Sequence, residues 1–193
     1  RFELSRYGEK LAASARSFKP LLAALKEEPT LLDLMIEEIT EELWRLHRPD
    51  VVGLSVPFPG NVYGAFRISR KLKQLDPAIK IIMGGGYVNT ELRSLSDARV
   101  FDTVDFITLD DGARPLLCVL EFIAGKITEK NLLRTYIRVR KKVCFFSDSR
   151  LKDVSQKDAG IPTYDGLSLD RYLSLFEMLN PMHRLWSDGH WNK

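Results

Sequence analysis

Apolar residues recur along the chain with two different spacings, one typical of amphipathic helices and the other of short buried strands. Between Thr30 and Leu46 the apolar positions follow the helical spacing, and Thr30 with Asp33 resembles a capping box at the start of a helix. The apolar positions of this predicted helix are Leu32, Met35, Ile36, Ile39, Leu43 and Leu46. Residues 51–56 follow as a nearly all-apolar run rich in β-branched residues, which predicts a strand covered on both faces of its sheet.

The unit of strand, loop and helix then repeats. Residues 62–75 carry a helical stripe that ends at Asp76-Pro77, and the apolar run 79–83 is closed by consecutive glycines. A further apolar run, residues 105–109, is closed by an acidic loop. Strands that alternate with helices predict an α/β fold with a parallel, doubly wound, Rossmann-like (flavodoxin-like) sheet and flanking helices. The strands should be neighbours joined by right-handed crossovers.

The pattern changes after a helix that Pro115 and Gly125 bracket. Residues 135–139 and 143–146 flank a basic turn with no helix-length stretch between them. They predict a β-hairpin that takes one edge of a small sheet. Residues 147–168 are polar and turn-rich, and they predict a linker that leads to a C-terminal helical tail with its helix at about 170–179.

Length supports one folded domain with two extensions. At 193 residues the chain has room for one α/β domain with a sizeable core and a modest appendage. We expect a leader at 1–30, the Rossmann-like domain with its terminal hairpin at 31–146, and a linker and helix at 147–193. Because the chain begins at Arg1, we also expect it to be part of a longer protein.

Composition predicts a soluble, cytoplasmic protein. The chain is 45% hydrophobic and 28% charged, with no apolar run long enough to span a bilayer and no secretory leader, so a membrane is not an expected partner. The formal net charge is +3 and basic residues are scattered among acidic ones, so nucleic acid is not indicated as a partner either. Cys118 and Cys144 each lie among apolar neighbours, which predicts buried free thiols in a reducing compartment.

Loops with the composition of a ligand site follow the predicted strands at residues 55–60, 84–89 and 110–112. In an open α/β sheet, ligands bind outside the carboxyl ends of the strands, where glycines let the backbone approach a cofactor. The glycines and a proline can also serve only to make tight turns, and each loop alone leaves that alternative open. Gly84-Gly85-Gly86 lacks the spacing of a dinucleotide fingerprint and no Walker lysine follows it, so a nicotinamide or ATP site is not expected.

Residues 52–57 (VGLSVP), 81–87 (IIMGGGY) and 104–112 (VDFITLDDG) together resemble the cobalamin-binding domain found ahead of radical SAM domains. The resemblance covers roughly residues 48–125. In that family a strand-end serine and a glycine pair line the slot for the nucleotide tail of the corrinoid, and Ser55 and Gly84-Gly85 stand in those places. The cofactor-binding residues that the resemblance implies are Ser55, Val56, Pro57, Gly84, Gly85, Gly86, Tyr87, Asp110, Asp111 and Gly112.

The sequence departs from the family pattern in the third loop and in the lower axial ligand. Asp110-Asp111-Gly112-Ala113 stands where the family more often has Gly-Glu-Gly-Glu, so the acidic character is kept. Many corrinoid domains ligate cobalt through the histidine of an Asp-x-His-x-x-Gly motif, which is absent here because Arg45 and Asp50 flank His47 in the places of the aspartate and glycine. We expect His47 to flank the helix end. Cobalamin is therefore expected to bind base-off, without a protein histidine ligand.

The resemblance also implies a radical SAM barrel further along the same polypeptide. A [4Fe–4S] cluster needs a Cys-x-x-x-Cys-x-x-Cys triplet, and two distant cysteines cannot supply it. We expect the cluster and SAM in that downstream domain, and residues 180–191 are similar to the segment just before the cluster cysteines in one branch of the family. The parent would be an Fe–S oxidoreductase or methyltransferase, and this chain alone would not be catalytic.

Other interpretations remain open at this point. The same fold can serve as a structural or interaction cap that has lost its corrinoid site, and the missing histidine motif favours this alternative. A flavodoxin-like domain that binds a flavin or nucleotide is another. Asp105, Asp110 and Asp111 resemble a phosphoacceptor cluster, but its lysine and hydroxyl partners are not identifiable. We expect neither metal binding nor base stacking from the polar and aromatic residues of the tail, His183, Trp186, Asp188, His190 and Trp191.

Overall fold

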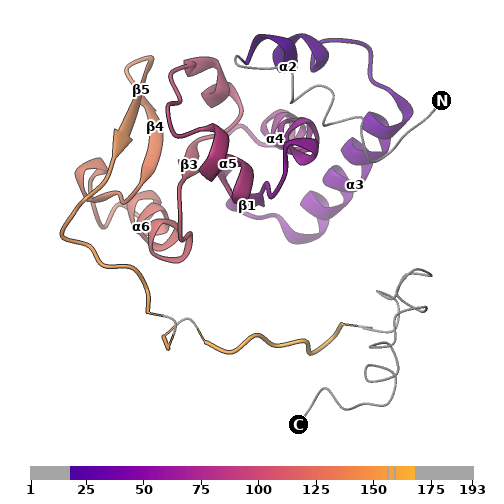
Figure 1. The fold of residues 1–193 in the computed structure, drawn as a ribbon. Helices are drawn as coiled ribbons and strands as arrows, with labels where there is room; N and C mark the ends of the chain where they lie inside the picture. The colour runs from indigo at the N-terminus through magenta and orange to yellow at the C-terminus, as the bar shows by residue number, and fades with distance from the viewer. Residues whose placement is uncertain (1–17, 156, 159, 168–193) are drawn as a thin grey trace, which may run out of the picture. The chain divides into compact units, whose positions relative to one another are not determined.

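The computed structural model describes residues 18–155, 157–158 and 160–167, and the predicted helix at 170–179 lies outside them. The chain divides into two compact units, Arg1–Ser155 and Gln156–Lys193. The described part of the first unit is an α/β domain built on an open, mixed, five-stranded sheet with helices (Figure 1). The strands, in their spatial order, are β1 (Val51–Ser55), β2 (Lys80–Gly84), β3 (Phe106–Thr108), β4 (Thr135–Val139) and β5 (Lys142–Phe146).

The sheet combines a parallel half with an antiparallel hairpin. β1, β2 and β3 are parallel neighbours, as the sequence predicts, and the register pairs Ser55 with Gly84. The hairpin β4–β5 joins β3 antiparallel and occupies one edge, which is also as predicted. Its turn has positive φ at Arg140 (47°) and Lys141 (68°), the left-handed pair that lets a two-residue turn match the twist of the strands.

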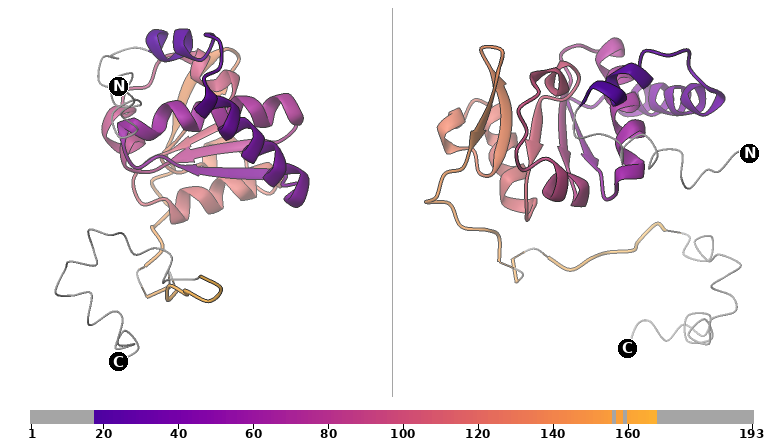
Figure 2. Two further views of the ribbon diagram at one scale, coloured as in Figure 1. Left: turned by 90° about the vertical axis from the view of Figure 1, so that its right-hand side faces the viewer. Right: turned by 45° about the horizontal axis from the view of Figure 1, so that its top comes forward.

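Helices lie on both faces of the sheet (Figure 2). Alternate residues of β2 show the division, because Ile81 and Met83 belong to one core and Ile82 to the other. The first core is covered by α2 (Lys19–Ala24), α4 (Val62–Leu75) and α5 (Gly86–Glu91), and the second by α6 (Ala113–Ile123). The remaining elements are α3 (Leu31–His47) and the 3-10 turns η1 (Pro59–Asn61), η2 (Ala98–Asp102) and η3 (Glu129–Asn131). No helix in the part of the chain that the structure describes has the length and apolar character needed to cross a membrane.

The part of the predicted leader that the structure describes includes segments of the folded domain. Leu21 and Leu25 are buried in the first core, and the ring of Phe18 lies 5.1 Å from that of Phe66 in α4, centroid to centroid. The carbonyl oxygen of Leu25 accepts hydrogen bonds from the guanidinium groups of Arg67 and Arg70. Two arginines of α4 therefore satisfy a carbonyl that the end of α2 would otherwise leave without a partner.

Helix α3 begins at the predicted capping box. The backbone N–H of Asp33 donates to Thr30 Oγ1 (3.3 Å), and the N–H of Thr30 donates back to Asp33 Oδ2 (2.8 Å). The fully buried residues of the helix are nevertheless polar, because Asp33 and Thr40 are only 2% and 7% exposed, and Trp44 beside them packs against the first core. Several of its apolar side chains, such as Ile39 and Leu43, are about half exposed. The amphipathic pattern thus correctly predicts a helix, but this helix turns a polar side towards the domain.

Arg67 of α4 neutralises the buried side of α3. Its side chain is 4% exposed, and its Nε lies 3.5 Å from Asp33 Oδ1 and 3.2 Å from Glu37 Oε1. Burial acts to raise the pKa of Asp33, but hydrogen bonds from Thr30 and the nearby positive charge of Arg67 more than offset it, so this pKa lies below its ordinary value. Asp33 is therefore a buried carboxylate that is held in its charged form.

Replacing Arg67 with methionine should lower the free energy of unfolding by about 3 kcal/mol, because Asp33 would stay buried without its counter-charge. Urea denaturation followed by circular dichroism measures this loss. The matched control is Arg45→Met, which removes an exposed ion pair with Glu41 within α3 and should cost less than about 1 kcal/mol. Equal losses in the two variants would contradict a buried ionic contact between α3 and α4.

Candidate functional site

The residues that the sequence analysis selects lie in the loops after β1, β2 and β3, at the carboxyl ends of the parallel strands. The first two loops are bonded to each other through their backbones. The N–H of Val56 donates to the carbonyl of Gly84 (2.8 Å), and the N–H of Tyr87 donates to the carbonyl of Val56 (3.0 Å). Val56 is completely buried, whereas Ser55 and Pro57 are exposed. The loops therefore form one continuous surface at this edge of the sheet.

The glycines of the second loop permit that close contact. A Cβ on Gly85 would lie 2.7 Å from both the N and the O of Val56, and Gly85 has a φ of 106°, which side-chain-bearing residues rarely adopt. A Cβ on Gly86 would lie 2.7 Å from the carbonyl oxygen of Pro57. Backbone packing alone thus requires glycine at both positions. In this conformation no ligand group has room to pass between the two loops.

Gly84 differs from Gly85 and Gly86, because a Cβ there would point towards the neighbouring strand β3 and not towards the first loop. The nearest atom to it would be Thr108 Oγ1, at 3.0 Å. Gly53, Ser55 and Gly84 lie on the face of the sheet that also carries Ile82, since parallel partners in register point the same way. A Cβ on Gly53 would meet nothing within 4 Å. These small residues form a floor without large side chains at the carboxyl edge of this face.

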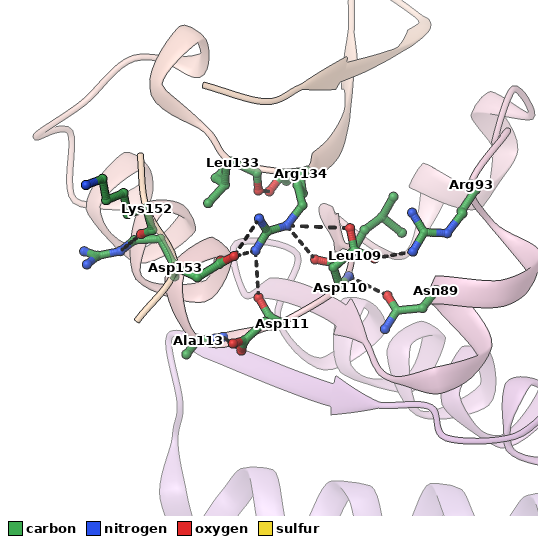
Figure 3. Close-up of polar contacts among 12 residues, drawn as sticks. Asn89, Arg93, Leu109, Asp110, Asp111, Ala113, Leu133, Arg134, Lys152 and Asp153 are labelled. Atoms are coloured by element: carbon green, nitrogen blue, oxygen red, sulfur yellow. Dashed lines mark hydrogen bonds and ion pairs between the residues drawn. The ribbon is translucent and has the colours of Figure 1, made fainter. Parts of the chain in front are cut away.

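The acidic third loop is held by side chains from two directions (Figure 3). Asp110 has a φ of 62°, and its backbone N–H donates to Asn89 Oδ1 over 2.7 Å. Arg93 forms an ion pair with the carboxylate of Asp110. Asn89 lies in α5 and Arg93 just after it, so the second loop and its helix orient the third loop. The charge of Asp110 is already balanced within the domain.

Arg134, just before β4, is a central residue of this region that the sequence analysis missed. Its guanidinium donates to the carbonyl of Asp111 (3.2 Å) and to the carboxylate of Asp153, and its Nε lies 3.7 Å from Asp110 Oδ2 (Figure 3). The hydrogen bond to Asp153 and the nearby acidic charges raise the pKa of Arg134, and the same contact lowers the pKa of Asp153. Because Asp153 lies in the predicted linker, the start of that linker is bound to the domain. No local sequence signal distinguishes Arg134 from the other arginines.

Asp111 and Gly112 lead into α6. Asp111 Oδ1 accepts a hydrogen bond from the N–H of Ala113 (3.3 Å) at the start of that helix. Both residues are exposed, and a Cβ on Gly112 would meet nothing within 4 Å, so backbone packing does not require glycine there. Of the predicted site residues, Asp111 and Gly112 are therefore among those that stay accessible at the edge.

Asp105 and His47, which the sequence analysis also considers, lie away from the carboxyl ends of the strands. Asp105 precedes β3, where its carboxylate accepts the N–H of Ile81 (2.8 Å) and pairs with Lys73 (2.8 Å), so it is separated from Asp110 and Asp111 by the length of the strand. A phosphoacceptor cluster is thus not formed. His47 ends α3 just before β1, at the opposite end of that strand from Ser55.

Cysteines and metal ligands add no further centre in the described residues. Cys118 in α6 is buried and Cys144 in β5 is half-buried, and both are free thiols. Burial raises the pKa of the Cys118 thiol above its ordinary value. Within residues 18–155, 157–158 and 160–167, no group of histidine, cysteine, aspartate and glutamate side chains is arranged to hold a metal ion. The predicted tail residues, from His183 to Trp191, lie outside the described residues.

Comparisons with known proteins do not assign the chain to a family. No protein-family model matches the sequence, and no curated protein matches it at a significant level.

Gly85→Ala should destabilise the domain by about 2 kcal/mol or more, because the new Cβ would strain a positive φ and push the two loops apart. Gly53→Ala is the matched control at a position with open space and should stay within about 1 kcal/mol of the unsubstituted protein. Thermal and urea unfolding of both variants measure the difference. A Gly85→Ala protein as stable as Gly53→Ala would contradict the backbone contact between the loops.

Proposed function

We propose that this chain is the corrinoid-binding module of a cobalamin-dependent radical SAM enzyme and that it is not catalytic alone. In this proposal the domain is a doubly wound, Rossmann-like fold whose ligand lies at the carboxyl ends of the parallel strands. The observation that carries the proposal is the pairing of Ser55 with Gly84 in register, next to an open floor of small residues. These are the residues that the resemblance to cobalamin-binding domains selects.

The chain's own residues would position the cofactor. The exposed hydroxyl of Ser55 and the backbone beside Gly84 would contact the nucleotide tail, and Asp111 and Gly112 would border it on the α6 side. Bound cobalamin supplies a cobalt centre that can carry a methyl group to a substrate at a neighbouring active site. His47 lies at the far end of β1, so cobalamin would be held base-off without a histidine of this segment. SAM and the [4Fe–4S] cluster would belong to a downstream barrel.

A second candidate function is a structural or interaction cap that has lost the corrinoid site. Two observations favour it. The close backbone of Val56 and Pro57 is enough to require glycine at positions 85 and 86 without any ligand. The charge of Asp110 is balanced by Arg93. A site that no longer holds a ligand would be expected to close through internal contacts of this kind. Binding of the cofactor distinguishes the two candidates.

Equilibrium dialysis of the 193-residue protein against hydroxocobalamin should give saturable binding, and the absorbance spectrum should become that of base-off cobalamin because no protein imidazole replaces the dimethylbenzimidazole on cobalt. Ser55→Leu should weaken binding by about tenfold or more, since the larger side chain would occupy the floor beside Gly84. Ser55 is exposed, so this variant should be as stable as the unsubstituted protein. It is a better probe than Gly85→Val, whose fold would be disturbed.

His47→Ala is the matched control and should leave the affinity unchanged. Binding that is lost in His47→Ala but retained in Ser55→Leu would contradict the proposed orientation. Failure of the protein, and of a longer polypeptide that includes the following domain, to retain hydroxocobalamin would favour the structural cap.

A further inference from the structure

The first part of the predicted linker, residues 148–155, forms a strap that is bound to the domain and leads to the second compact unit. The backbone N–H of Asp148 donates to the carbonyl of Leu132 (2.9 Å), and Leu151 packs against the second core. Arg114, in the first turn of α6, donates through its Nε to the carbonyl of Lys152 (3.0 Å). The strap is therefore held by the domain along residues 148–152, before the chain reaches Asp153.

Arg134 connects this strap to the acidic loop, residues 110–112. On the strap side, its two terminal nitrogens donate to the two carboxylate oxygens of Asp153, a bidentate geometry that fixes the orientation of both groups. On the loop side, it donates to the carbonyl of Asp111 (3.2 Å), and its Nε lies 3.7 Å from Asp110 Oδ2. One guanidinium, in a side chain that is 19% exposed, thus contacts both segments at once.

The backbones of Asp110 and Arg134 are both held in an unfavourable conformation. Asp110 has a φ of 62° and Arg134 a φ of 44°, the left-handed region that residues with side chains adopt only rarely. The two segments also contact each other through their backbones, because the N–H of Leu109 donates to the carbonyl of Arg134 (2.9 Å). Strained conformations persist only while the surrounding contacts hold them. Loss of contacts on one side should therefore let the other side relax.

Contacts from α5 reach the acidic loop from the side opposite the strap. Figure 3 shows Asn89 and Arg93 on one side of Asp110, and Lys152 and Asp153 on the other. We propose that Arg134 is a positioning residue that couples the acidic loop to the strap, so that the two segments are held or released together. Release of the strap would lengthen the free connection between the two compact units.

The coupling is a property of the folded chain, and it holds whether the site takes a corrinoid or the domain is a structural cap. A ligand that changes the contacts of the acidic loop would shift the strap between its bound and free states. A partner that binds the free strap would change the loop by the same coupling free energy, because such a linkage is reciprocal. The candidate site and the chain that leaves the domain would therefore respond to each other.

Cleavage of the 193-residue protein by a lysine-specific protease tests the coupling from the loop to the strap. The bond after Lys152 should be cut only when the strap leaves the domain, since the carbonyl of Lys152 is bound to Arg114. Arg134→Met should raise the rate of this cleavage by about tenfold, and Asn89→Ala, on the far side of the loop, by about fivefold. In the double variant, Asn89→Ala should add less than about twofold, because its effect passes through Arg134.

Thr90→Ala is the matched control on the same helix. The hydroxyl of Thr90 donates within α5, to the carbonyl of Gly86 (3.2 Å), so its loss should leave cleavage after Lys152 unchanged. Cleavage after Lys80 in β2 reports unfolding of the whole domain and should stay slow in every variant. The proposal is overturned if Asn89→Ala leaves the rate after Lys152 unchanged, acts equally with and without Arg134, or acts no more strongly than Thr90→Ala. An equal rise after Lys80 would also overturn it, since the opening would then be global.

Amide exchange followed by NMR tests the reverse direction, from the strap to the loop. Asp153→Asn, at a side chain that is 47% exposed, should speed exchange of the Asp110 N–H by about threefold or more. Arg150→Met breaks an ion pair with Asp148 inside the strap, and as the matched control it should leave that exchange unchanged. Unchanged exchange at Asp110 in Asp153→Asn would overturn the coupling. Hydroxocobalamin enters neither measurement, so failure here is distinct from failure of the proposed function.

Discussion

The backbone contact between the loops that follow β1 and β2 determines the form of the candidate site. Val56 donates to Gly84 and accepts from Tyr87, and both hydrogen bonds need the close approach that Gly85 permits. This contact aligns the carboxyl ends of the parallel strands and places α5, which in turn holds the acidic loop through Asn89. Gly85 and Gly86 are thus taken up by the contact between the two loops. In the proposed function, a cofactor would meet the floor at Gly53, Ser55 and Gly84.

The acidic side chains of the third loop and those of α3 are neutralised in different environments. At the acidic loop, Arg134 links Asp110, Asp111 and Asp153 with charges that are partly exposed, so each contact is screened by solvent. Between α3 and α4, Arg67 faces Asp33 in a buried environment where an unpaired charge would be costly. The second arrangement fixes the rotation of α3. Because the polar side of the helix is bound to Arg67, several of its apolar side chains are left exposed.

Local sequence signals predict the elements and their order well. The capping box at Thr30, the apolar runs and the basic hairpin turn each reflect short-range physics, and the structure contains a helix, strands and a hairpin at these places. The rotation of α3 could not be predicted, since it depends on an arginine more than thirty positions away in sequence. Arg134 was missed because its partners, Asp110, Asp111 and Asp153, are also distant from it in the sequence. The glycines of the second loop stand out in the sequence, but the sequence alone does not separate a need for backbone packing from a need for ligand access.

Differential hydrogen–deuterium exchange of the protein with and without hydroxocobalamin tests the central proposal most directly, because it locates any bound ligand on the chain. The account predicts slower exchange in peptides that cover residues 53–57, 84–87 and 110–112, with α3 and the hairpin unchanged. Unchanged exchange at the carboxyl ends of β1 and β2, or protection confined to the opposite end of the sheet near His47, would contradict it.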